Sequence, residues 1–159
     1  MFDNNGMFDE CKIEGDFVLS SGRKSQYFYD FDLLLPRETA TYSEYMVQAV
    51  PRDLKKSINF IATPATGGII PGFLMAFAMA KPLVIVEKDG TLRGPKYDGG
   101  NYLIVDDVIS SFREVNRVRS LLPKSKCVGV SAYIFRGAMS DLTRQDFPCF
   151  YLSRKEIEE

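Results

Sequence analysis

Short apolar runs alternate with longer mixed segments along this chain, and the alternation predicts strands and helices in turn. Strands are predicted at 17–19, 26–31, 58–62, 83–86, 102–105, 128–134 and 149–152. Helices are predicted at 39–50, 69–80 and 113–122, with a long polar loop at 87–101. Because the run at 102–105 is continuously apolar, it suits a central parallel strand that is buried on both faces. This order of elements predicts an α/β fold with a doubly wound parallel sheet, whose strand ends converge on a crevice.

The size and charge of the chain favour one compact domain. With 159 residues, of which 45% are hydrophobic, it can bury one substantial core and hardly two, so we predict a single domain over 1–159. Its 20 basic and 21 acidic residues are dispersed, which gives no electrostatic case for a nucleic acid or an anionic membrane as partner. The amino-terminal M-F-D-N-N-G lacks the features of a signal peptide, and the longest apolar segment, 69–80, is too short to span a membrane.

The cysteine and histidine content limits the kinds of catalysis and metal binding that the chain can support. Cys11, Cys127 and Cys149 are odd in number and lack a C-x-x-C spacing, so we expect reduced thiols in a cytoplasmic protein rather than disulfides or a zinc site. The chain has no histidine, which removes Ser/His and Cys/His nucleophilic catalysis and imidazole ligation of metals. Any chemistry must therefore use carboxylates, cations, hydroxyls or backbone groups.

The segment L-I-V-D-D-V-I-S-S, 103–111, places two adjacent carboxylates after an apolar run. Because burying both without partners would be costly, Asp106 and Asp107 are expected to face a cleft and to hold a polyhydroxyl ligand or a hydrated cation. Ser110 and Ser111 precede a predicted helix, where hydroxyls and backbone N–H groups can bind phosphate. From this fragment alone, a helix cap and a solvated turn are an equally good interpretation.

A glycine loop, A-T-P-A-T-G-G-I at 62–69, lies between the strand predicted at 58–62 and the helix predicted at 69–80. Glycines let backbone N–H groups turn toward an anion. Taken alone, the loop is better explained by an ordinary strand-to-helix turn.

Three segments together resemble the orotate phosphoribosyltransferases, which are type I phosphoribosyltransferases. G-D-F-V-L-S-S-G-R-K-S-Q-Y-F-Y-D at 15–30 is similar to their base-binding segment, 62–69 to their pyrophosphate loop, and D-D-V-I-S-S to their phosphoribosyl-pyrophosphate (PRPP) motif. The resemblance covers about 15–137. It implies a Rossmann-like core, about 36–159, with a small amino-terminal base-binding hood, about 1–35.

The resemblance also implies roles for individual residues. It assigns Asp106, Asp107, Lys88 and Arg93 to catalysis, the last two in a mobile cationic loop. PRPP would be bound by Thr66, Gly67, Gly68, Val108, Ser110, Ser111 and Arg113. The base would contact Phe28, Tyr29 and Arg136, of which the arginine would hold a carboxylate. Asp106 and Asp107 would also hold Mg²⁺, through water.

The implied reaction is transfer of phosphoribose from PRPP to a pyrimidine base, with orotate as the expected base, and release of pyrophosphate, by a cytoplasmic homodimer. Three residues depart from the pattern of the family. Ser20 replaces a lysine that contacts substrate, and Phe112 and Arg113 replace residues of the 5-phosphate loop. A transferase for another base, or a non-catalytic relative that binds a nucleotide or a protein, are therefore open alternatives.

Overall fold

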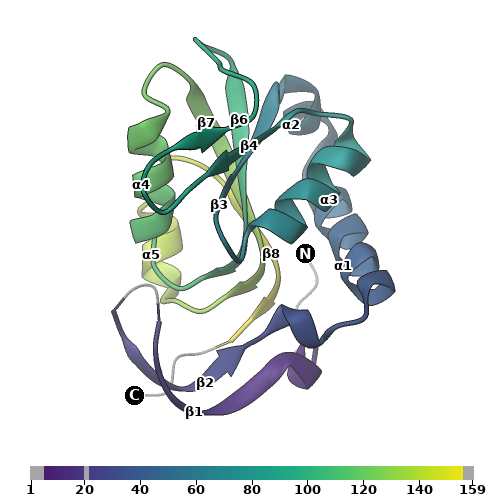
Figure 1. The fold of residues 1–159 in the computed structure, drawn as a ribbon, viewed down its shortest axis with the longest axis vertical. Coiled ribbons are helices and arrows are strands. Elements are labelled where there is room, and N and C mark those ends of the chain that lie inside the picture. The colour runs from purple at the N-terminus through teal and green to yellow at the C-terminus, as the bar shows by residue number, and fades with distance from the viewer. Residues whose placement is uncertain (1–5, 20–21, 156–159) are drawn as a thin grey trace.

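The computed structural model describes residues 6–19 and 22–155, which form a central sheet, flanking helices and a separate hairpin (Figure 1). The strands are β1 (Lys12–Val18), β2 (Lys24–Tyr29), β3 (Phe60–Pro64), β4 (Leu83–Val86), β5 (Leu92–Arg93), β6 (Asn101–Ile109), β7 (Lys126–Phe135) and β8 (Cys149–Arg154). The helices are α1 (Pro36–Ala49), α2 (Arg52–Ser57), α3 (Ile69–Met79), α4 (Arg113–Leu121) and α5 (Met139–Thr143), with 3-10 turns η1 (Asp9–Cys11) and η2 (Phe31–Leu33). None of the helices in these two ranges is long and apolar enough to cross a membrane.

The central sheet has the strand order β5-β4-β3-β6-β7-β8. All neighbouring pairs are parallel except β4 and β5, which are antiparallel. From β3 the chain moves outward to β4 and then returns to the other side of β3 as β6. Such a reversal opens a crevice at the carboxyl ends of the two central strands, which is where ligands bind in open α/β sheets.

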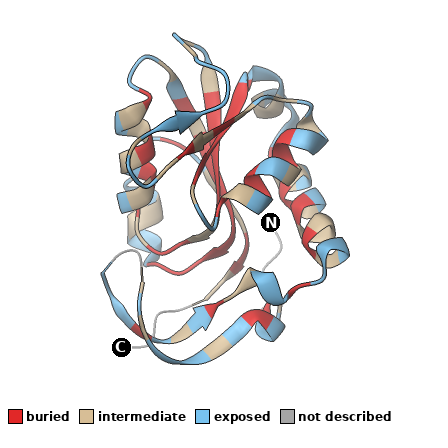
Figure 2. Cartoon of the chain, viewed as in Figure 1, coloured by how far each residue is buried: buried red, intermediate tan, exposed pale blue. Residues whose placement is uncertain are grey.

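Alternate residues of the central strands bury opposite faces of the sheet. In β3, Phe60 and Ala62 belong to the core under α4, and Ile61 between them belongs to the core under α1 and α3. The helices contribute apolar residues to match, such as Val118 from α4 and Met75 from α3. Figure 2 shows the sheet buried between these two helical layers. This double burial explains why the strand sequences are continuously apolar.

The β1–β2 hairpin lies apart from the sheet, at the foot of the molecule in Figure 1. Its strands pair antiparallel, with an irregular register between Glu14 and Phe17. Aromatic rings pack beside it: the centroid of Phe31 lies 5.4 Å from that of Phe8 and 5.1 Å from that of Tyr133 on β7. The hairpin is thereby fixed near the carboxyl ends of the sheet strands.

The doubly wound α/β fold predicted from the sequence is confirmed, with local differences. The predicted strand 102–105 extends through both carboxylates to Ile109, because its parallel pairing with β7 continues as far as Ile109 and Phe135. The loop predicted at 87–101 contains β5, whose pairing with β4 brings Leu92 opposite Val86. The short helices α2 and α5 were not predicted, since five or six residues show too little periodicity.

Candidate active site

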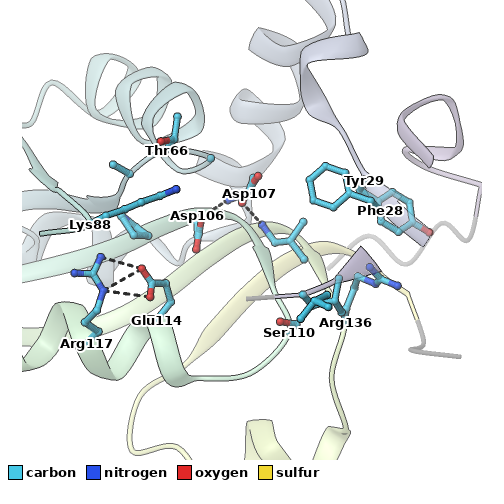
Figure 3. A pocket seen from close by; sticks show the side chains of 16 residues that line it. Phe28, Tyr29, Thr66, Lys88, Asp106, Asp107, Ser110, Glu114, Arg117 and Arg136 are labelled. Atoms are coloured by element: carbon cyan, nitrogen blue, oxygen red, sulfur yellow. Dashed lines mark hydrogen bonds and ion pairs between the residues drawn. The ribbon is translucent and has the colours of Figure 1, made fainter. Parts of the chain in front are cut away.

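A cavity of about 560 Å³ opens at the carboxyl ends of β3, β4, β6 and β7, beside the β1–β2 hairpin (Figure 3). Its walls come from parts of the chain that are distant in sequence. They comprise Val18, Leu19, Phe28, Tyr29, Pro64, Ala65, Thr66, Gly67, Lys88, Asp106, Asp107, Val108, Ser110, Glu114, Arg117 and Arg136. The tertiary structure therefore brings together most of the residues that the sequence singled out.

The two carboxylates lie in the middle of this cavity (Figure 3). The Asp107 N–H donates to Asp106 Oδ1 at 2.8 Å, and the Val108 N–H donates to Asp107 Oδ1 at 2.7 Å. Burial and the neighbouring charge of Asp107 raise the pKa of Asp106 well above its usual range, and burial also raises the pKa of Asp107. Neither carboxylate forms an ion pair within the described ranges, so hydroxyl donors or a cation from a ligand would stabilise their charge.

The glycine loop packs directly against the carboxylate pair. A Cβ atom on Gly67 would lie 2.5 Å from Asp107 Oδ2, so any other residue there would displace this carboxylate. The hydroxyl of Thr63 lies 2.6 Å from the carbonyl oxygens of both Gly68 and Val105, and it links the loop to β6. The peptide bond between Ala65 and Thr66 is cis. The loop is thus built into the wall of the cavity and is more than a reversal of chain direction.

The residues predicted to bind phosphate follow β6, and only some of them line the cavity. Ser110 is buried within the protein but lines the cavity, whereas Ser111 and Arg113 are not among the lining residues. Phe112 turns away from the cavity into the core under α4, where its ring lies 6.0 Å from that of Phe147. Arg113 is exposed and points toward the hairpin turn, with Nη1 4.0 Å from the position of a Cβ on Gly22. Phe112 therefore does not obstruct the cavity.

The two predicted catalytic cations have different positions. Lys88 projects into the cavity above Asp106 (Figure 3). Arg93 lies on β5 outside the cavity, and its guanidinium donates to Glu87 Oε1 at 2.8 Å. The sequence could not show which of the two faces the cavity, because it did not reveal that β5 folds back and pairs with β4.

The predicted base-binding residues line the hairpin side of the cavity. Phe28 leaves 44% of its surface exposed, whereas Tyr29 is buried. Arg136, just after β7, is 2% exposed and donates to Ser25 Oγ at 2.9 Å and to the Tyr27 carbonyl at 3.1 Å. It therefore lines the cavity and also binds the hairpin to the core. Ser20, the departure noted in the sequence, lies outside the described residues.

Sequence reasoning missed Glu114 and Arg117, both of which line the cavity. Arg117 Nη2 lies 2.9 Å from Glu114 Oε1, one turn of α4 away. Their i, i+3 spacing on a helix with apolar Val115 and Val118 was the available signal. It did not show that this polar face of the helix borders the cavity.

The donor set suits a magnesium ion only if substrate supplies further ligands. Across 6–19 and 22–155, no group of three or more acidic or cysteine side chains is arranged to hold a metal. Two neighbouring carboxylates nevertheless match the usual protein share of a Mg²⁺ site, in which phosphates and water provide the remaining oxygens. Asp106 and Asp107 fit that limited role.

Comparison with known proteins agrees with the geometry. The orotate phosphoribosyltransferase of Sphingopyxis alaskensis is 37% identical over 109 residues, which are 64% of this chain and 56% of the relative. That of a Thermus thermophilus strain is 30% identical over 135 residues, or 78% of this chain and 72% of the relative. The crystal structure of the Aeropyrum pernix orotate phosphoribosyltransferase superposes with a TM-score of 0.75 at 25% identity, covering 91% of this chain and 88% of that one. No protein-family model matches.

The fold, with its glycine loop and paired carboxylates around one cavity, is that of the type I phosphoribosyltransferases. Within this class the chain belongs to the orotate phosphoribosyltransferase family. It spans only a little over half, 56%, of the length of the Sphingopyxis relative.

Proposed function

We propose that this protein transfers phosphoribose from PRPP to orotate and releases pyrophosphate. One observation carries the proposal: the pyrophosphate-type loop, the carboxylate pair, the start of α4 and the exposed ring of Phe28 line a single cavity. Its volume of about 560 Å³ lies within the range usual for small-molecule sites. A filled 5-phosphate subsite would favour the alternative, a non-catalytic relative that binds a nucleotide or a protein.

The 5-phosphate subsite is proposed at the start of α4. Ser110 lines the cavity, and the amino-terminal end of a helix favours an anion. Phe112 packs into the core instead of into this space, which argues against a filled phosphate subsite. Ser111 and Arg113 would reach the phosphate only by rearranging.

The base is proposed to lie on the hairpin side of the cavity. Phe28 offers an exposed aromatic face for a planar ring, and Tyr29 lies beside it. Arg136 lines the same space, and its positive charge would attract the carboxylate of orotate. The family relation supports orotate over other bases.

The ribose is proposed to sit over Asp106 and Asp107. Their carboxylates would accept hydrogen bonds from its hydroxyls and stabilise positive charge that develops on the ring as pyrophosphate leaves. Mg²⁺ held through water by the same carboxylates would neutralise charge on the departing pyrophosphate. Backbone groups of Thr66 and Gly67 line the cavity and would bind that leaving group. Gly68, also predicted to bind PRPP, is buried behind them, and its N–H donates to the Pro64 carbonyl at 3.2 Å.

Lys88 is the proposed cation for the leaving group. A nitrogen of the base attacks the anomeric carbon of PRPP while the bond from that carbon to the pyrophosphate oxygen breaks. The ammonium group of Lys88 projects over the carboxylates and would stabilise the negative charge that forms on pyrophosphate. Arg93, which is paired with Glu87 outside the cavity, would contribute only after release from that ion pair.

Titration calorimetry with PRPP and magnesium, with and without orotate, tests the proposal when pyrophosphate release is followed in the same samples. We expect PRPP to bind and pyrophosphate to appear only when orotate is present. If PRPP binds and pyrophosphate is released with another base but not with orotate, the protein is a transferase and the proposed base is wrong. Absence of PRPP binding would overturn the transferase function.

We further propose a single domain, with a hood at about 1–35 and a core at about 36–159, that forms a homodimer in the cytoplasm. The outer face of α3 presents Ile70, Phe73 and Phe77, of which Phe77 is 79% exposed. Such an apolar stripe on a surface helix is typical of an interface. All three cysteines are free, as expected in a reducing compartment.

A further inference from the structure

Lys88 is carried by a tight turn between β4 and β5. The Glu87 N–H donates to the Thr91 carbonyl at 2.8 Å, and the Gly90 N–H donates to the Glu87 carbonyl at 3.0 Å. Gly90 has a positive φ of 88°, which favours glycine. Glu87 therefore defines where the turn begins and where the next residue, Lys88, leaves it.

Arg117 of α4 binds this turn by a hydrogen bond to its main chain. Its Nη1 donates to the Glu87 carbonyl at 3.1 Å, so that this oxygen accepts from both Arg117 and Gly90. Its Nε and Nη2 donate to the carboxylate of Glu114 at 2.9 to 3.2 Å. The two side chains are 29% and 33% exposed, so water screens this fork less than it would a fully exposed pair.

We propose that Glu114 and Arg117 together position Lys88 over the carboxylate pair. We call this ion pair, with its hydrogen bond to the Glu87 carbonyl, the latch. The proposal rests on the proposed transferase function, in which Lys88 stabilises the leaving pyrophosphate. Arg117 is then a positioning residue: it holds the backbone from which Lys88 projects, and Glu114 fixes its guanidinium. Figure 3 shows the fork directly below Lys88 and beside Asp106.

The chemistry of the latch requires a guanidinium. One planar group must donate in two directions, to a carboxylate on its own helix and to a main-chain carbonyl on another segment. Lysine has one nitrogen on a flexible chain and cannot hold both directions with the same geometry. A misplacement of about 1 Å at a reacting group can cost about a hundredfold in rate, so a small shift of the turn would matter.

A double-mutant cycle tests whether Arg117 acts through Lys88. Arg117→Met, Lys88→Met and the double variant are compared in kcat and KM for PRPP. We expect each single variant to lower kcat by about 10- to 100-fold, and the double variant to fall no further than Lys88→Met alone. Multiplying effects would show that Arg117 contacts substrate on its own account and would overturn the proposal.

Three further variants separate the latch from general effects of charge. Arg119→Met removes an arginine from the same helix, where it faces Asp146 and the ring of Phe147 rather than the turn, and it should leave kcat unchanged. Glu114→Gln removes a charge but keeps an acceptor for Arg117, whereas Glu114→Ala removes both. We expect Gln to retain most of the activity and Ala to lose it; equal losses would contradict a positioning role.

Hydrogen exchange gives a measurement that does not depend on turnover. Amides at 87–91 should exchange faster in Arg117→Met than in wild type or Arg119→Met, while the amides of β6 keep their protection. Unchanged exchange at 87–91 would disprove the latch, whatever the effect of Arg117→Met on turnover. Faster exchange in a protein that fails to bind PRPP would instead retain the latch and reject the proposed function.

Discussion

At the scale of single residues, this site depends on close contacts of two glycines, where an added side chain would displace its neighbours. Gly67 has no space for a Cβ because Asp107 Oδ2 would lie only 2.5 Å from it. Gly68 is confined by backbone as well: a Cβ there would lie 2.7 Å from the Pro64 carbonyl oxygen. The two neighbouring glycines therefore serve different purposes, one for the position of a carboxylate and one for the path of the chain.

Gly67→Ala should weaken PRPP binding at least about tenfold, because the added methyl group displaces the Asp107 carboxylate. Its thermal unfolding should shift little, since a side chain can move aside. Gly68→Ala is the matched variant and should lower the unfolding temperature markedly, because backbone must move. Calorimetric PRPP titration and thermal melts of both variants check this contrast, and equal loss of stability in the two would contradict it.

A buried thiol makes the free energy of unfolding depend on pH. Burial raises the pKa of Cys11 from about 9 to about 12, so its thiol stays protonated in the folded chain where the unfolded chain ionises. The free energy of unfolding should therefore be insensitive to this group below pH 9 and should fall as pH rises from about 9 toward about 12. Denaturant unfolding of wild type and Cys11→Ala across this range checks it: the wild type should show the steeper decline.

At the scale of elements, the start of α4 shows how a substitution in a motif can be accommodated. Phe112 replaces a small residue of the family's phosphate loop, yet its ring packs against Phe135 on β7 and Phe147 and leaves the cavity open. The same turn leaves Ser110 on the wall of the cavity. The aromatic ring of Phe112 thus anchors the start of α4 to the core.

Phe112→Ala should lower the free energy of unfolding by about 3–5 kcal/mol, as expected for removing a buried aromatic ring. Equilibrium denaturation measures this loss. A change of less than about 1 kcal/mol would mean that Phe112 is not part of the core. The exposed neighbour Arg113 offers the control, since Arg113→Ala should change stability little.

At the scale of the whole molecule, one face of the fold presents an apolar surface. The sheet buries its strands under α1 and α3 on one side and α4 on the other, but α3 turns Ile70, Phe73 and Phe77 outward. In a monomer this stripe would face water. In the proposed homodimer, a second copy of the chain would cover this stripe.

Phe77→Glu should convert the proposed dimer to a monomer, because it places a charge in the middle of an apolar contact. Light scattering after gel filtration reads the mass directly. Phe73→Glu should act in the same way, whereas Glu44→Lys, on the neighbouring helix α1, should leave the mass unchanged. A wild-type protein that is monomeric at micromolar concentration would reject the homodimer.

The sequence by itself determined the order of elements, the sheet class and the identity of the main candidate residues. The first two follow from local physics, because continuous apolar runs mark buried strands and their alternation with helices marks the sheet class. Most of the candidate residues came instead from the resemblance of three segments to a known family. Only the tertiary structure decided that Lys88 faces the cavity and Arg93 does not, that Phe112 enters the core, and that Arg117 reaches Glu87. These outcomes depend on which side of a turn or helix a residue faces once distant segments have packed, and no short stretch of sequence contains that information.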